Sequence, residues 1–206
     1  MTRRMAALVG GLAALLLLVT AAWAGKTVFE DKFANLDPAW GAPCPIMNVK
    51  DGKFVITPEK NTTQTILNQA NIIPNDMEAS YALTFVQAPA PTWGSGLVFW
   101  AKDYDEYYAV LMNAQGWFAV QRHVAGRYLL PVAWREAEVI KKGAGAENQV
   151  KVTTKGNQAA VAINGKEVIS FNGQPPEGGS LIGFKVASGA EGGNSAGFAN
   201  LKIIQP

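Results

Sequence analysis

Cysteine and histidine are each represented by a single residue in this chain of 206 residues, Cys44 and His123. One cysteine cannot form a disulfide within the chain, so the fold has to be stabilised by a packed core. The usual zinc sites combine several Cys and His ligands and are therefore excluded. Cys44 lies between Pro43 and Pro45. Because unpaired cysteine packs as a small apolar side chain, we expect it to be buried; the alternative is an exposed thiol available for an intermolecular disulfide.

The chain also lacks a large net charge of either sign. Its 18 basic and 16 acidic residues give a formal net charge of +2, and Arg3 and Arg4 supply that excess. Residues 25–206 are neutral and contain no basic run, so they lack the electrostatic footprint of a nucleic-acid-binding protein. No P-loop or dinucleotide-binding glycine pattern is present either.

The first residues have the composition of an export signal. Two arginines precede an apolar run over residues 6–19, and Ala22 and Ala24 are the small residues of a cleavage site. The run is shorter than the ~20 residues that span a bilayer, and no later apolar stretch is long enough. We predict a signal peptide, residues 1–24, whose removal leaves one domain, residues 25–206, without a membrane span, in the periplasm or outside the cell.

Helical periodicity is almost absent after the predicted signal. Apolar residues alternate with polar ones, or form short runs between Gly, Pro, Asn and Asp. Asp51-Gly52 and Asn164-Gly165 are signals for two-residue hairpin turns. Pro131 places its strand at a sheet edge or in a bulge. Besides three strands between residues 96 and 124, we expect strands over residues 27–33, 46–50, 53–57, 63–69, 77–86, 127–134, 148–154, 158–163, 166–171, 181–187 and 197–204. Short strands at regular spacing predict an all-β sandwich or barrel.

The stretch from Gly96 to Val124 carries the most informative pattern. Alternation sorts the side chains of its three strands into two faces. One face is apolar and is expected to face the interior: Leu97, Phe99, Tyr108, Val110, Met112, Phe118 and Val120. The opposite face mixes aromatic, amide and imidazole side chains: Trp100, Tyr107, Asn113, Trp117, Gln121 and His123.

The mixed face has the composition of a glycan-binding surface. Flat rings stack on the apolar faces of pyranose rings, so Trp100, Tyr107 and Trp117 are the expected stacking platforms. The amides and the imidazole are the expected hydrogen-bonding partners of sugar hydroxyls. The alternative is that these aromatic residues pack under a loop or lie singly on a solvated face. Trp93, Tyr128 and Trp134 flank the three strands, but alternation does not fix their direction.

Acidic residues offer little catalytic machinery. A glycosidase needs two carboxylates, ~5–5.5 Å apart for retention or ~6.5–9.5 Å for inversion. The nearest acidic candidates for catalysis are Asp103, Asp105 and Glu106, whose place before a strand favours a solvated turn, and the pair Asp76 and Glu78 at the start of another strand. His123 is the remaining candidate. Asp103 and Asp105 are also candidate calcium ligands, since Ca²⁺ takes carboxylate oxygens from loops.

Several motifs, taken in order, resemble the concanavalin A-like lectin/glucanase superfamily. These motifs are FEDKF at residues 29–33, the VKDGKFVI hairpin, GLVFWAKDYDEYY, GWFAVQRHVAGRY, AINGKEV, and the closing LIGFKVAS and SAGFANLKI. They span residues 27–204 and are nearest to the bacterial laminin-G-like, 3-keto-disaccharide-hydrolase-like branch. However, the E-x-D-x-E type of strand motif found in the glucanase branch is missing. The resemblance implies a jelly roll of two curved antiparallel sheets with a concave face that often holds glycan, and many members bind calcium.

Three functions follow from these patterns, because a fold alone does not fix an activity. The first is a non-catalytic carbohydrate-binding domain that takes a glycan or oligosaccharide, with no cofactor or with Ca²⁺. The second is a hydrolase of glycosides or keto sugars with the same fold. The third is a structural or protein-interaction domain of the cell envelope, with a protein partner.

Overall fold

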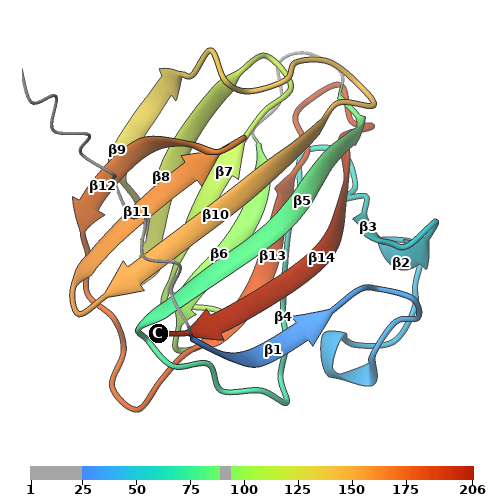
Figure 1. The fold of residues 1–206 in the computed structure, drawn as a ribbon. Helices are drawn as coiled ribbons and strands as arrows, with labels where there is room; N and C mark the ends of the chain where they lie inside the picture. Colours follow the sequence, from blue (N-terminus) through green and yellow to red (C-terminus); the bar gives the residue numbers. More distant parts are fainter. Residues whose placement is uncertain (1–24, 89–93) are drawn as a thin grey trace, which may run out of the picture.

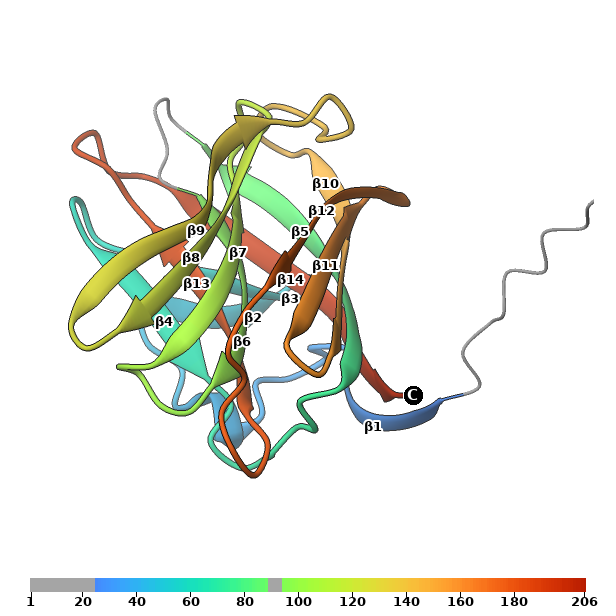
Figure 2. The same ribbon diagram turned by 90° about the vertical axis from the view of Figure 1, so that its left-hand side faces the viewer.

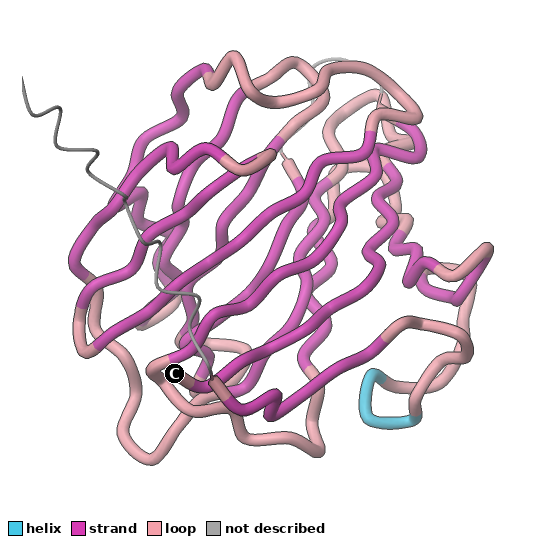
Figure 3. Tube along the Cα trace, in the orientation of Figure 1, coloured by secondary structure: helices cyan, strands magenta, loops and turns pink. Residues whose placement is uncertain are grey.

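Two antiparallel sheets packed face to face make up the fold (Figure 1). The computed structural model describes residues 25–88 and 94–206, so the predicted signal peptide and Trp93 lie outside the described residues. Strands dominate this part of the chain (Figure 3), which confirms the predicted jelly-roll β-sandwich. Its helical content is the 3-10 turn η1 (Pro38–Trp40), and no described helix has the length and apolar character of a membrane span.

The first sheet, sheet A, has eight strands. They are β1 (Lys26–Asp31), β2 (Met47–Lys50), β3 (Lys53–Ile56), β5 (Met77–Gln87), β10 (Glu147–Lys155), β11 (Gln158–Ile163), β12 (Lys166–Asn172) and β14 (Ser195–Gln205). The order across the sheet is β12-β11-β10-β5-β14-β3-β2, and β1 pairs with the second half of β14. The first and last described strands, β1 and β14, therefore lie side by side in one sheet.

The second sheet, sheet B, has six strands. They are β4 (Thr63–Leu67), β6 (Ser95–Ala101), β7 (Tyr107–Met112), β8 (Trp117–Val124), β9 (Arg127–Glu136) and β13 (Leu181–Ala187). The order is β4-β13-β6-β7-β8-β9, which places β13 between β4 and β6, two strands that both precede it by 80 residues or more in the chain. The β8–β9 hairpin projects away from sheet A (Figure 2).

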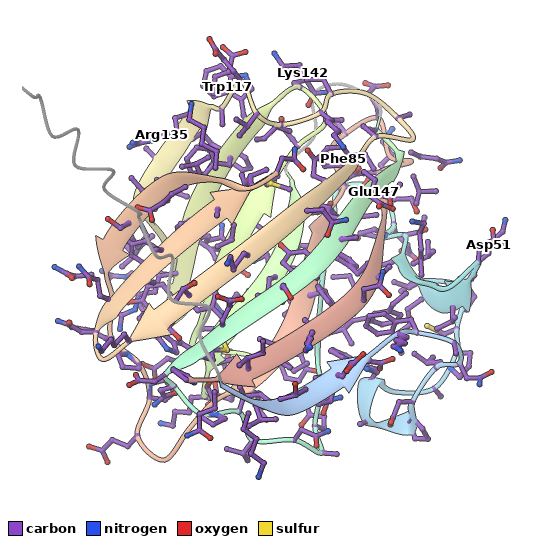
Figure 4. All side chains as sticks on the ribbon, viewed as in Figure 1. Asp51, Phe85, Trp117, Arg135, Lys142 and Glu147 are labelled. Atoms are coloured by element: carbon purple, nitrogen blue, oxygen red, sulfur yellow. The ribbon has the colours of Figure 1, made fainter. Side chains whose placement is uncertain are left out.

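Both predicted two-residue hairpin turns are confirmed. Asp51 and Gly52 have φ of 51° and 69°, and Asn164 and Gly165 have φ of 50° and 83°. Positive φ at both central residues is the turn geometry whose twist matches that of the flanking strands, and Asn-Gly and Asp-Gly adopt it at low cost. Figure 4 shows Asp51 at the tip of the β2–β3 hairpin.

The prediction for Pro131 is confirmed as well. Its strand, β9, is the edge strand of sheet B. The register of β9 against β8 shifts twice, between Phe118 and Val120 and between Val120 and Arg122, and each shift leaves an extra residue in β9. An edge strand with bulges tolerates a residue that has no N–H to donate.

The core lies between the sheets and is rich in aromatic rings. Its centre is Phe184 on β13, which stacks on Phe198 of β14 with ring centroids 4.0 Å apart. Alternate residues of β5, from Met77 to Phe85, face this core. So do all the residues predicted for the apolar face of β6, β7 and β8: Leu97, Phe99, Tyr108, Val110, Met112, Phe118 and Val120. The alternation of apolar residues therefore identified the interior faces correctly.

Trp100 is an exception, and its predicted place on the opposite face is wrong. Its indole is 1% exposed and packs in the core against Phe99 and Tyr108, with centroids 5.4 and 5.6 Å away. The cause is a bulge in β6. Trp100 has φ of +46°, and the register against β13 shifts at this point. The extra residue reverses the alternation, so Phe99 and Trp100 both point inward while Ala101 points outward.

The expected burial of Cys44 is also wrong, because the side chain is exposed. Its backbone exchanges hydrogen bonds of 3.0 and 3.1 Å with Met47 in the turn that leads into β2. This tight turn lies at the surface, where the thiol has no core to enter.

Candidate functional site

A buried lysine lies across the outer face of sheet B. The ammonium nitrogen of Lys185, on β13, donates to the phenol oxygen of Tyr107 on β7 at 2.8 Å and to Oε1 of Gln121 on β8 at 2.6 Å. The side chain is only 3% exposed. It crosses β6 at Gly96, its partner in the ladder, where a Cβ would come within 1.8 Å of the carbonyl oxygen of Val110. Glycine at this position therefore allows the backbones of β6 and β7 to approach closely beneath the lysine.

Aromatic rings surround the ammonium group. It lies 4.4 Å from the centroid of the Tyr128 ring on β9 and 5.1 Å from that of Tyr107, within the range of cation–π attraction. His123 stacks on Tyr128 with centroids 4.4 Å apart, and its Nδ1 is 3.1 Å from the carbonyl oxygen of Tyr104. We call this set the Lys185 cluster: Tyr104, Tyr107, Gln121, His123, Tyr128 and Lys185.

Burial determines the electrostatics of the cluster. It lowers the pKa of Lys185 from 10.5 to about 8, because the charged ammonium loses hydration. It also raises the pKa of the Tyr107 phenol well above its usual value, so this hydroxyl stays protonated. Among the described residues, none of the ion pairs includes Lys185. The cluster thus holds a cation among neutral partners.

Three of the residues predicted to bind glycan come together in this cluster: Tyr107, Gln121 and His123. Trp117 is on the same strand as His123, six residues away and hence about 20 Å along it, and is 42% exposed. Figure 4 shows Trp117 at the end of the strand, near Lys142. Trp117 therefore lies outside the cluster.

Asn113 has a structural role in the turn between β7 and β8. Its Oδ1 accepts hydrogen bonds from the backbone N–H groups of Gln115 and Trp117, at 3.1 and 3.0 Å. This is the local bonding by which asparagine stabilises turns. The predicted contact of Asn113 with a sugar stays a prediction, and the structure shows that this oxygen already serves the turn.

The acidic candidates do not assemble into a catalytic or metal-binding set. Oδ1 of Asp103 accepts hydrogen bonds from the backbone N–H groups of Asp105 and Glu106, at 2.8 and 2.9 Å, which makes the segment a turn. Glu106 forms a long ion pair of 3.9 Å with Arg122. Across residues 25–88 and 94–206, no three His, Cys, Asp or Glu side chains gather closely enough to hold a metal ion. The calcium site at Asp103 and Asp105 therefore stays a prediction.

The central residue of the cluster, Lys185, was missed by sequence reasoning. Its signal was present, because Lys185 is the only charged residue in the apolar strand Leu181–Ala187. A lone lysine in such a strand must either leave the sheet or find polar partners. Tyr128 was noted without a direction, and Tyr104 lies in a loop that has no periodicity. Trp134 packs beside the cluster on the apolar part of the same face: Leu67, Val98, Ala101, Tyr107, Ala109 and Leu111.

No protein-family model and no curated protein matches the sequence. Solved structures do match the fold. They include the carbohydrate-binding module CBM66 from Bacillus subtilis, 14% identical over 73% of this chain and 86% of that chain, with a TM-score of 0.58. The exoplasmic/lumenal domain of VIP36, bound to Ca²⁺ and mannose, is 13% identical over 78% and 81% of the two chains, with a TM-score of 0.60. A structure described with endo-acting O-glycanases of the human gut microbiota is 9% identical over 88% and 100%, with a TM-score of 0.59. At these identities the likeness shows that the fold is a lectin-like β-sandwich.

Proposed function

We propose that the protein is a carbohydrate-binding β-sandwich and that the outer face of sheet B holds the glycan. The observation that carries this proposal is the Lys185 cluster, which gathers tyrosine rings, an imidazole and an amide on one sheet face. Tyr128 is 57% exposed and offers a ring for stacking on a pyranose, and the half-buried Gln121 offers an amide beside it. His123 is 9% exposed and supports the Tyr128 ring by stacking on it. Trp117 would serve as a second platform for a longer glycan.

The proposal extends to the class and location of the protein. The order of the sequence motifs supports the laminin-G-like, 3-keto-disaccharide-hydrolase-like branch of the concanavalin A-like superfamily, and the lectin-like folds among the solved structures are consistent with the superfamily. We place the mature domain at residues 25–206, exported through a signal peptide to the periplasm or the exterior. We propose binding without catalysis, because the carboxylate of Asp103 is bonded within its own turn and that of Glu106 pairs with Arg122. Calcium plays no part in this proposal.

A glycan array tests the proposal with residues 25–206 as wild type and as Tyr128→Ala. We expect the wild-type protein to retain a defined set of glycans. The affinity of the variant for these glycans is expected to fall by about tenfold or more, as for other central aromatic contacts. Leu130→Ala is the matched control, because Leu130 is on the same strand and 46% exposed but outside the cluster. A blank array with folded wild-type protein, or equal retention by Tyr128→Ala, would refute the proposal.

A further inference from the structure

Lys185 has hydrogen-bonding capacity that its neutral partners do not use. An ammonium group has three N–H donors. Two of them are directed to the oxygens of Tyr107 and Gln121, and the nearest remaining group is the face of the Tyr128 ring. A charge that is removed from water without an opposite charge is costly, and its usual remedy is a partner of opposite sign.

None of the elements around the ammonium supplies that opposite charge. The titratable groups that face it are Tyr107 from β7, His123 from β8 and Tyr128 from β9, while β4 and β6 contain no titratable residue. Tyr104 and Asp105 stand in the loop before β7. Asp105 acts weakly on the Tyr107 phenol, but no carboxylate offsets the effect of burial on Lys185.

A neutral sugar would not offset the positive charge of Lys185. Tyr107 and Gln121 would be held equally well by a neutral hydrogen-bonding residue on β13, without the loss of ammonium hydration. An anionic group, in contrast, would complete the set, because its oxygens accept from the ammonium and from the amide of Gln121 together. Access leads past the ring of Tyr128, which is more than half exposed.

We propose that the Lys185 cluster selects acidic glycans. The anionic group of the sugar, a carboxylate or a sulfate ester, binds the Lys185 ammonium and the Gln121 amide, and the sugar ring stacks on Tyr128. This inference rests on the proposed glycan-binding function and names the class of sugar that the same face takes.

Matched acidic and neutral probes test this selectivity. Calorimetric titrations use polygalacturonate against its methyl ester, and dextran sulfate against dextran, with wild-type protein, Lys185→Met and Lys151→Met. Lys151 is the control, because it is a half-exposed lysine of sheet A that is paired with Glu78. We expect at least one acidic probe to bind tenfold or more tightly than its neutral partner. Lys185→Met abolishes this preference and Lys151→Met retains it. The two probe pairs separate carboxylate from sulfate recognition.

A second measurement needs only wild-type protein. The NMR signal of the Lys185 side chain is titrated with pH in the presence of galacturonate, glucose 6-sulfate or galactose. An anion that binds the ammonium raises the titration midpoint by half a pH unit or more, whereas galactose leaves it unchanged. An equal midpoint with all three sugars, or array ligands that are neutral and bind Lys185→Met as well as wild type, overturns the inference but leaves glycan binding standing. Protein that binds no glycan of either kind overturns both.

Discussion

Trp100→Ala is expected to lower the free energy of unfolding by about 3–5 kcal/mol, the usual effect of emptying a large aromatic site in a core. The indole is buried between Phe99 and Tyr108, and its N–H donates to the carbonyl oxygen of Asn75 at 3.0 Å. Gly173 lies directly on it, since a Cβ there would be 2.5 Å from the ring. Neighbours this close leave a cavity when the ring is removed, because they cannot collapse fully.

Urea unfolding of the variant and of Trp117→Ala measures this effect. Trp117 was predicted on the same face as Trp100, but it is 42% exposed, so its replacement is expected to change the free energy of unfolding by less than about 1 kcal/mol. Similar stabilities for Trp100→Ala and wild type would contradict the inward position of Trp100. The contrast between the two tryptophans tests the β6 bulge directly.

The second large effect is a rise in stability with pH. Burial lowers the pKa of Lys185 to about 8 in the folded protein from 10.5 in a solvated chain. Between these values the unfolded chain binds more protons than the folded one, so the free energy of unfolding increases with pH. We expect a gain of about 2–3 kcal/mol from pH 8 to pH 10. Above pH 10 the gain is opposed, because the buried Tyr81 and Tyr107 have raised pKa values and disfavour ionisation in the folded state.

Lys185→Met separates this effect from that of other titrating groups. Without the amine, the rise between pH 8 and pH 10 is absent, and at pH 7 the variant is more stable than wild type because no charge has to be buried. Urea unfolding of both proteins at pH 7, 8, 9 and 10 gives the difference at each pH. Parallel curves would show that the ammonium is well solvated and that the Lys185 cluster is not closed as described.

The strands and their interior faces could be predicted because the necessary information is local. Asp51-Gly52 and Asn164-Gly165 specify their turns by themselves, and alternation follows from strand geometry. Alternation failed at Trp100 because a bulge depends on how β6 pairs with β13, a strand about 80 residues later in the chain. Nothing in the tripeptide Phe99-Trp100-Ala101 signals the extra residue.

The candidate site could be predicted less completely than the strands, because it depends on pairing between strands that are far apart in the sequence. Tyr107, Gln121 and His123 were found because they lie on adjacent strands of one meander. Lys185 joins them only because β13 is inserted between β4 and β6, and that order is not readable from spacing. The lone lysine among apolar residues was a usable signal of partners on the sheet face, although it did not say which.

The most direct test of glycan binding on sheet B is an NMR titration of labelled residues 25–206 with the strongest array ligand. We predict that the largest amide shifts surround the Lys185 cluster, at Tyr107, Gln121 and Tyr128. Sheet A offers a competing surface, a depression of about 380 Å³ lined by Thr153, Lys155, Gln158, Ala159, Ala160, Glu167 and Ser170. Shifts confined to that surface, with the cluster unperturbed, would contradict the assignment of the binding face.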